Sequence, residues 1–89
     1  MMEKLFKQMM EEKHDFYHYM ELNEMCSDPT TKAKLHAIMS QELQHYKELY
    51  DIVFKEDPNK TWSAIEKAVW HQSKEWYEEM LEELKHFGK

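Results

Sequence analysis

The fold is decided by one stretch of sequence, LHAIMSQELQHYKELYDIVF (residues 35–54). It lacks Gly and Pro, and its apolar residues recur at intervals of three and four, the period of an amphipathic α-helix. The main apolar stripe consists of Leu35, Ile38, Met39, Tyr46, Leu49, Ile52 and Val53. A second apolar flank beside it consists of Leu43, Tyr50 and Phe54. We therefore expect this helix to pack against more than one neighbour.

An Asp-Pro pair breaks the pattern on each side of this stretch. Before it, Asp28 is suited to an N-cap and Pro29 to the first position of a helix. After it, Asp57-Pro58 ends the periodic run. Because the connections are short, consecutive helices should be antiparallel neighbours.

A third helix is expected after the second break. Ser63 and Glu66 have the spacing of a capping box, although Thr61 is a competing cap. Gly88 follows the last apolar residue, as is typical of a helix end. The sequence thus predicts an all-α fold with helices at about 2–26, 29–55 and 61–87, in which an antiparallel hairpin is joined by a third helix.

The two outer helices also carry apolar stripes. The first helix has Leu5, Met9, Phe16, Tyr19 and Cys26, with Asn23 among them. The third helix has Trp62, Ile65, Val69, Trp76, Met80 and Phe87, with Gln72 among them.

Composition agrees with a small helical protein. The 89 residues include one Gly and two Pro, and we expect a single domain spanning residues 1–89. A core of this size is modest, so oligomerisation is a common way to enlarge it. The net charge of −6 has no clustered basic face, which argues against nucleic acid as a partner.

The cellular setting is inferred from features that the sequence lacks. Cys26 is the single cysteine, which excludes an internal disulfide framework and a CxxC metal site. No apolar run approaches the roughly 18–20 residues of a membrane span, and the N-terminal residues lack the apolar region of a signal peptide. The expectation is a cytoplasmic protein with no membrane partner.

Three residues do not belong on the apolar stripes where they occur. Glu12 lies in the middle of the first stripe and Glu42 in the middle of the second, and His45 lies one turn after Glu42. An ionised carboxylate in an apolar core costs several kcal/mol unless it is paired or binds a metal. Glu42 and His45 at i and i+3 can reach the same ion, and carboxylate with imidazole suits Fe(II) or Mn(II).

The Glu-x-x-His spacing alone is a weak signal, since it occurs three times. Glu11/His14 points away from the first stripe, and Glu83/His86 lies near the end of the third helix. Only Glu42/His45 has apolar surroundings and a second inward Glu on the neighbouring helix, which singles it out as the candidate metal site.

The stretch from about Glu11 to Leu49 resembles the ferritin-like superfamily, in particular rubrerythrin-type and encapsulated-ferritin-type half-bundles. The matching segments are EEKHDFYHY (residues 11–19), the Ser-Asp-Pro turn and QELQHYKEL (residues 41–49). The spacing of the two inward Glu residues, 42 − 12 = 30, is similar to the encapsulated-ferritin pattern.

The resemblance implies a role for each matching residue. Glu12 and Glu42 resemble the carboxylate ligands of a di-iron centre, and His45 resembles the imidazole ligand. Glu11 resembles an accessory acidic metal-binding residue on the iron entry path. Tyr19 resembles the tyrosine near the metals and is the candidate catalytic residue.

The chain departs from these families because it supplies only half of a ligand set. Di-iron bundles use four Glu and two His from four helices, and the third helix offers only Gln72 where a second Glu-x-x-His is needed. A two-fold axis that packs the hairpin against its copy would provide the rest, so we expect a homodimer or larger homo-oligomer that forms a ferritin-like four-helix bundle. An encapsulin shell is a further implied partner, but the C-terminal ELKHFGK shows no clear docking peptide.

The leading hypothesis is a non-haem di-iron protein that oxidises Fe(II) with O2 or peroxide, a ferroxidase. A manganese or zinc site that only holds the dimer together is a weaker alternative. The alternative from another class is a metal-free helical module for protein–protein interaction, in which the same residues form a buried polar network.

The remaining candidate residues receive structural interpretations. Cys26 is expected to be a small buried apolar group, and the three tryptophans are expected to anchor the core or an interface. His36, His71 and His86 are expected at the surface.

Overall fold

A computed structural model describes residues 2–55 and 62–87 of the chain, and it is all-helical over these residues. The helices are α1 (Met2–Met25), α2 (Pro29–Val53) and α3 (Ala64–Phe87). The three predicted helices are therefore confirmed, with ends that differ by up to three residues. Thr61 and Gly88, which the sequence suggested as a cap and a helix end, lie outside the described residues.

Two predicted helix caps are present. The Asp28 carboxylate accepts hydrogen bonds from the Thr31 backbone N–H at 2.9 Å and from the Thr31 hydroxyl at 2.7 Å, and Pro29 begins α2. Before α3, the Glu66 N–H donates to Ser63 Oγ at 3.1 Å and the Ser63 N–H donates to Glu66 Oε1 at 3.2 Å. These reciprocal bonds form the predicted capping box and satisfy backbone donors that the helix itself leaves unpaired.

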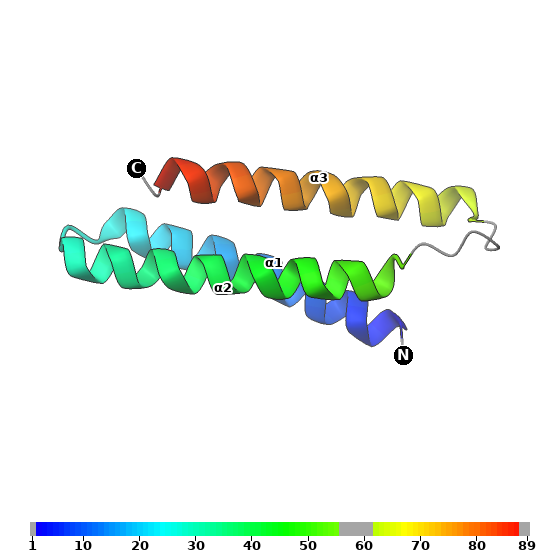
Figure 1. Cartoon of the computed structure of the whole chain (residues 1–89), viewed down its shortest axis with the longest axis horizontal. Helices are drawn as coiled ribbons and strands as arrows, with labels where there is room; N and C mark the ends of the chain where they lie inside the picture. The colour runs from blue at the N-terminus through cyan, green and yellow to red at the C-terminus, as the bar shows by residue number, and fades with distance from the viewer. Residues whose placement is uncertain (1, 56–61, 88–89) are drawn as a thin grey trace.

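The helices lie side by side in an elongated bundle with principal extents of 51 × 23 × 17 Å. α1 and α2 form an antiparallel hairpin in which α1 crosses behind α2 in the view of Figure 1, and α3 runs antiparallel to α2. α3 packs mainly on α2 and touches α1 in fewer places. The expectation that α2 contacts more than one helix is confirmed.

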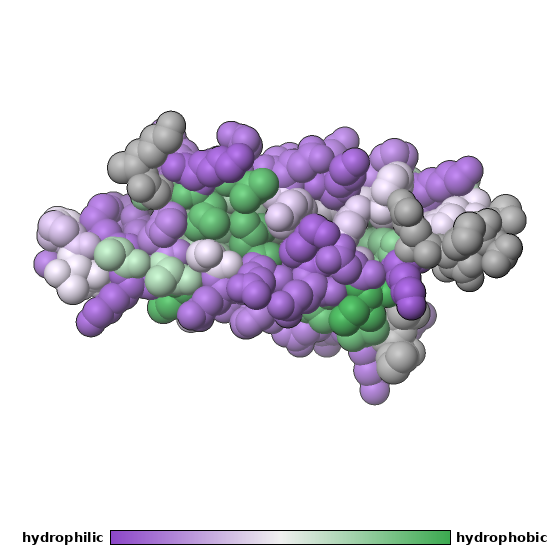
Figure 2. Space-filling view, viewed as in Figure 1, coloured by the Kyte–Doolittle hydropathy of each residue, from purple (hydrophilic) through white to green (hydrophobic). Residues whose placement is uncertain are grey.

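The core runs along the line where the three helices meet. Its buried apolar residues are Met9, Phe16, Met39, Leu43, Tyr46, Phe54 and Met80. Both flanks of α2 contribute, since Met39 and Tyr46 come from the main stripe and Leu43 and Phe54 from the second. On the face shown in Figure 2, hydrophobic surface is visible between α2 and α3, where Leu43, Leu81 and Leu84 line a groove.

The turn between α1 and α2 is fixed by polar contacts. Asn23 is buried and its amide donates to the Lys32 carbonyl at 2.9 Å. The Lys32 ammonium donates in return to the carbonyls of Asn23 at 2.6 Å and Cys26 at 2.9 Å. Cys26 is only half-buried, with Sγ 3.8 Å from the Asp28 carbonyl, so the expected full burial of this thiol is wrong.

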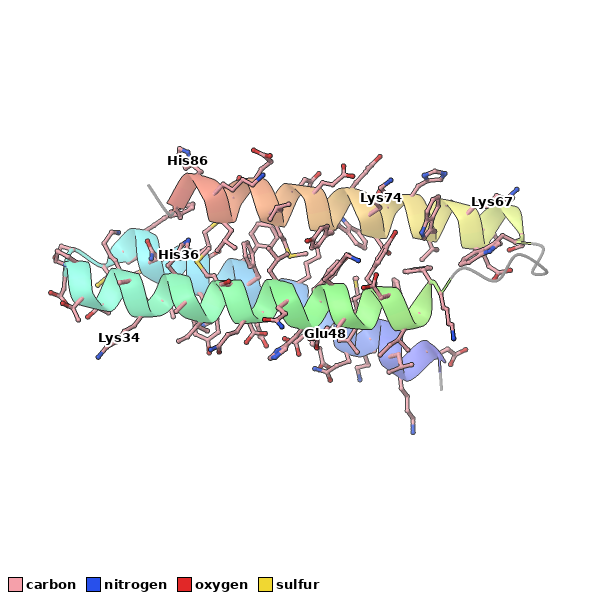
Figure 3. All side chains as sticks on the ribbon, viewed as in Figure 1. Lys34, His36, Glu48, Lys67, Lys74 and His86 are labelled. Carbon is pink, nitrogen blue, oxygen red and sulfur yellow. The ribbon has the colours of Figure 1, made fainter. Side chains whose placement is uncertain are left out.

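Within the part of the chain that the structure describes, two hydrogen bonds join α2 to α3. The Tyr46 hydroxyl donates to the Ser73 carbonyl at 2.7 Å, and His36 Nε2 lies 3.0 Å from the Leu84 carbonyl. Figure 3 shows His36 pointing from α2 towards α3. The expectation that His36 is a surface residue is wrong, because its ring is half-buried and lies against the Leu84 carbonyl of α3.

The predicted inward face of α3 is also partly wrong. Ile65 is 77% exposed and Gln72 is exposed, whereas Ser73 is fully buried. The face that contacts the hairpin is centred on Ser73 and is rotated by roughly 50° from the predicted stripe, at about 100° per residue. The small Ser73 side chain leaves room for Tyr46 to reach the backbone, which a search for apolar periodicity does not detect.

Candidate metal centre

The three residues that stood out on the apolar stripes come together across the α1–α2 hairpin. Glu12 lies in the middle of α1, and Glu42 and His45 lie one turn apart in the middle of α2. One ligand atom from each of the three residues lies within 4.8 Å of the others. The antiparallel pairing of the two helices brings them together, because residues at the midpoints of both helices lie at the same level.

The two carboxylates are more enclosed than the imidazole. The Glu12 side chain is 13% exposed and the His45 side chain is 54% exposed, and His45 Nδ1 lies 3.6 Å from Glu12 Oε2. Glu12 Oε1 accepts a hydrogen bond of 3.0 Å from the Gln8 amide. Glu42 Oε2 is buried, and no hydrogen-bond partner for it occurs among the described residues. A buried carboxylate oxygen without a donor is costly, and a bound cation would remove that cost.

The close approach of the carboxyl groups separates their pKa values. The pKa of Glu42 is raised to about 7, mainly by burial. The hydrogen bond with Glu12, the repulsion from Glu12 and the charge of Asp15 add to this effect. Burial alone would also raise the pKa of Glu12, but hydrogen bonds with Glu42 and Gln8 and the nearby His45 lower it below its ordinary value. Without a metal, the pair is therefore expected to share a proton that resides on Glu42.

The cluster opens on the side of the hairpin opposite α3. Two residues show which side of the hairpin faces α3. Lys13 of α1 lies over the Trp76 ring, and His36 of α2 lies against the Leu84 carbonyl. Leu22 and His45 each lie nine residues further along the same helices, so at about 100° per residue they point in the opposite direction. His45 is thus the exposed edge of the cluster.

We call this side of the hairpin the open face and define it by Tyr19, Leu22, Ile38, Leu49 and Ile52, which at about 100° per residue share it with the cluster. Leu22 is 37% exposed and Ile52 is 54% exposed, and the other three are half-buried. Ile52 was expected in the buried stripe, and its exposure within this chain corrects that expectation. Apolar residues therefore flank the carboxylates on a surface that α3 does not cover.

The donor set suits a hard or borderline cation. Two carboxylates and one imidazole are ligands for Fe(II), Mn(II) or Zn(II), and no thiolate is among them. Two atoms bound to one ion at about 2.1 Å each are at most about 4.2 Å apart. The three ligand atoms lie within 4.8 Å of one another, so small side-chain rotations would allow all three to bind the same ion. Three protein ligands also leave coordination positions open for a second chain, water or a substrate.

Two other predicted site residues are not part of this cluster. Glu11 is exposed on the neighbouring position of α1 and does not join the group of ligand atoms. Tyr19 lies two turns away, half-buried, with its ring 5.7 Å from the His18 ring, and within the described residues it donates no hydrogen bond to the three ligands. Their roles at the site stay predictions.

Two residues near the cluster were not anticipated from the sequence. Gln8 orients Glu12, and the charge of Asp15 acts on Glu42. Both follow from helix geometry, since they lie four residues before and three residues after Glu12. That spacing could have identified them once Glu12 was chosen as a ligand.

Comparisons with models of protein families, with curated proteins and with solved structures gave no match to this chain. Among the described residues, no helix combines the length and the apolar character that crossing a membrane requires.

Proposed function

We propose that this chain is one subunit of a non-haem di-iron carboxylate protein, whose metal centre is completed by a second copy and oxidises Fe(II) with O2 or peroxide. The observation that supports this most strongly is the meeting of Glu12, Glu42 and His45 within 4.8 Å, with one buried carboxylate oxygen lacking a donor. The ferritin-like pattern of the sequence supports the same proposal independently of the geometry.

A second copy would supply what one chain lacks. Two hairpins related by a two-fold axis along the open face bring together four Glu and two His, the ligand count of di-iron carboxylate bundles. The same contact would cover Leu22 and Ile52, which are exposed in the single chain. α3 would then lie on the outside of each hairpin and would not interfere with the contact.

Each residue of the cluster has a distinct role in this proposal. Glu12 is already ionised and is held in place by Gln8, so it provides a fixed negative charge. Glu42 would give up its proton if a cation bound, and its buried oxygen would then serve as a ligand. His45 would supply an imidazole nitrogen as the metal ligand on the exposed side of the site. Fe(II) bound here is the substrate, and its oxidation delivers electrons to the oxidant.

The test is an anaerobic Fe(II) titration of the metal-free protein, followed by exposure to air. The proposal predicts saturation at one iron per chain and oxidation faster than that of iron in buffer. The Glu42→Gln and His45→Gln variants should lose both properties. Glu48→Gln is a matched control, since Glu48 is exposed on the same helix and accepts a hydrogen bond from Gln44. Equal iron binding by the Glu42 variant and the control would overturn the proposal.

A metal-free interaction module is the second candidate, and the raised pKa of Glu42 beside Glu12 favours it. Because Glu42 can hold a proton near neutral pH, the pair of carboxyl groups then carries one negative charge instead of two, and less buried charge has to be compensated without a cation. Glu42→Leu distinguishes the candidates. In a metal-free module this change should leave stability equal or higher, whereas in a metal protein it should abolish the stabilisation that added Fe(II), Mn(II) or Zn(II) provides.

A further inference from the structure

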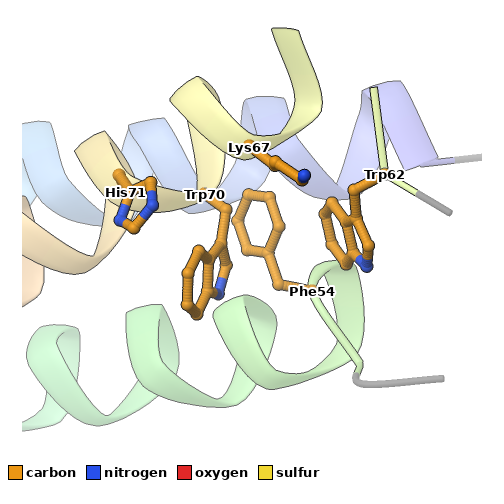
Figure 4. Close-up of a pocket in the computed structure, with 5 residues that line it drawn as sticks. All are labelled: Phe54, Trp62, Lys67, Trp70 and His71. Carbon is orange, nitrogen blue, oxygen red and sulfur yellow. The ribbon is translucent and has the colours of Figure 1, made fainter. Parts of the chain in front are cut away.

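An aromatic pocket lies between the C-terminal end of α2 and the start of α3, on the other side of α2 from the open face. It has a volume of about 310 Å³ and is lined by Phe54, Trp62, Lys67, Trp70 and His71. Figure 4 shows the Phe54 ring between the two indoles, with the Lys67 chain extending across the top of the pocket. Its size is at the lower end of the range for small-molecule sites, about 300–1,000 Å³.

The aromatic walls are held in place by their own contacts. The Phe54 ring lies 5.1 Å from the Tyr50 ring of α2. Phe54 in turn stacks on Trp62, with 6.1 Å between ring centroids and an angle of 25° between their planes. These walls come from α2, from α3 and from the residue just before the capping box. The pocket is therefore formed in the folded chain, and an occupant would not have to assemble it.

Two lysines lie at or beside this pocket. Lys67 and His71 lie at the pocket, and Lys74 lies over the outer face of Trp70 at 5.7 Å. The acidic residues of α3 gather towards its other end, where Glu75, Glu78, Glu79, Glu82 and Glu83 line a surface groove. No carboxylate of the described residues forms an ion pair with Lys67. The first turns of a helix also favour a negative charge through the aligned peptide dipoles.

From these features we propose that the pocket binds a small, flat, apolar carboxylate, with its ring system against Trp62 and Trp70 and its carboxylate on the Lys67 ammonium. The apolar walls select a planar body, because indole and phenyl faces stack on other aromatic rings. The single ammonium selects the anion over a neutral compound of the same shape, because a charge-assisted hydrogen bond is about twice as strong as a neutral one. This site does not depend on metal binding.

The probe is 2-naphthoate, titrated into the metal-free protein and followed through the indole N–H signals in NMR spectra. Trp62 and Trp70 should shift together and saturate. Trp76 should not, since its ring lies under Lys13 of α1. The neutral alcohol with the same ring system, 2-naphthalenemethanol, should bind about tenfold more weakly, the difference expected for one charge-assisted contact.

Two lysine variants separate the proposed contact from a general charge effect. Lys67→Met should remove the preference for naphthoate over the alcohol while the fold is retained, since Lys67 is exposed. Lys85→Met is the matched control, because it removes the same charge from the far end of α3, where the side chain is 62% exposed. Non-saturating shifts, equal binding of acid and alcohol, or an unchanged preference in Lys67→Met would overturn the proposal.

Discussion

At the scale of single residues, the candidate site is a pair of carboxyl groups with different proton affinities. Glu12 and Glu42 face each other across the hairpin, and the pKa of Glu12 is lowered while that of Glu42 is raised to about 7. The sequence predicted these two residues and His45, because charge in the middle of an apolar stripe needs compensation. It could not predict which carboxyl group keeps the proton, since that depends on the positions of Gln8 and Asp15 in space.

The raised pKa of Glu42 makes a prediction about stability. In the folded chain Glu42 holds a proton that the unfolded chain releases near its ordinary pKa of 4.5. Its contribution to stability is therefore full below about pH 4.5 and is lost as the pH rises through about 7. The lowered pKa of Glu12 has the opposite effect on stability, and that effect falls at pH values below this range.

Urea unfolding of the metal-free protein between pH 4.5 and 8, at fixed protein concentration, measures this effect. The free energy of unfolding should decline across the window in the natural sequence. Glu42→Gln should flatten that decline, because the amide carries no titrating proton. Parallel pH profiles for the two proteins would show that Glu42 has an ordinary pKa.

Gln8 is predicted to support metal binding through Glu12 without touching the metal. Gln8→Ala should weaken Fe(II) affinity by about tenfold, the lower end of the effect of groups that orient ligands. Gln44→Ala is the matched control, since Gln44 makes the same i, i+4 bond to the exposed Glu48. Equal affinities in the two variants would mean that Glu12 does not need this hydrogen bond.

At the scale of helices, local chemistry predicted the elements well and their orientation less well. Asp28, Pro29, Ser63 and Glu66 set two helix starts through contacts within four residues, so the sequence alone was sufficient. The rotation of α3 depends on how Ser73 fits against α2, which is a long-range contact. The exposed Ile65 follows from that rotation and could not have been seen in the periodicity.

Docking of α3 should depend on the Tyr46 hydroxyl. Tyr46 is fully buried, and its bond to the Ser73 carbonyl is one of two hydrogen bonds between α2 and α3 found among the described residues. Tyr46→Phe should lower the free energy of unfolding by about 1 kcal/mol, the net value of such a bond. Tyr19→Phe should change it less, because Tyr19 is only half-buried. Equal effects in thermal or urea unfolding would contradict this assignment.

At the scale of the whole molecule, α3 covers one side of the hairpin and leaves the open face uncovered. The group formed by Glu12, Glu42 and His45 lies on that uncovered side, where Leu22 and Ile52 are exposed. The sequence indicated a half-set of ligands and hence a second copy. It could not indicate which surface the copy would use, because the choice depends on where α3 packs.

A charge placed on the open face should separate the subunits. Ile52→Asp should convert a dimer of twice 11.0 kDa into a monomer of 11.0 kDa in sedimentation experiments. Ile65→Asp is the matched control, since Ile65 is 77% exposed on α3 and lies outside the proposed contact. Dissociation by both variants, or by the Ile65 variant alone, would place the subunit contact elsewhere.

Native mass spectrometry of the anaerobically loaded protein tests most directly whether two chains together hold a pair of iron ions. The predicted species contains two chains and two iron ions, and Glu42→Gln should remove the iron. A single chain that carries iron by itself, or a dimer that carries none, would contradict the proposed shared centre.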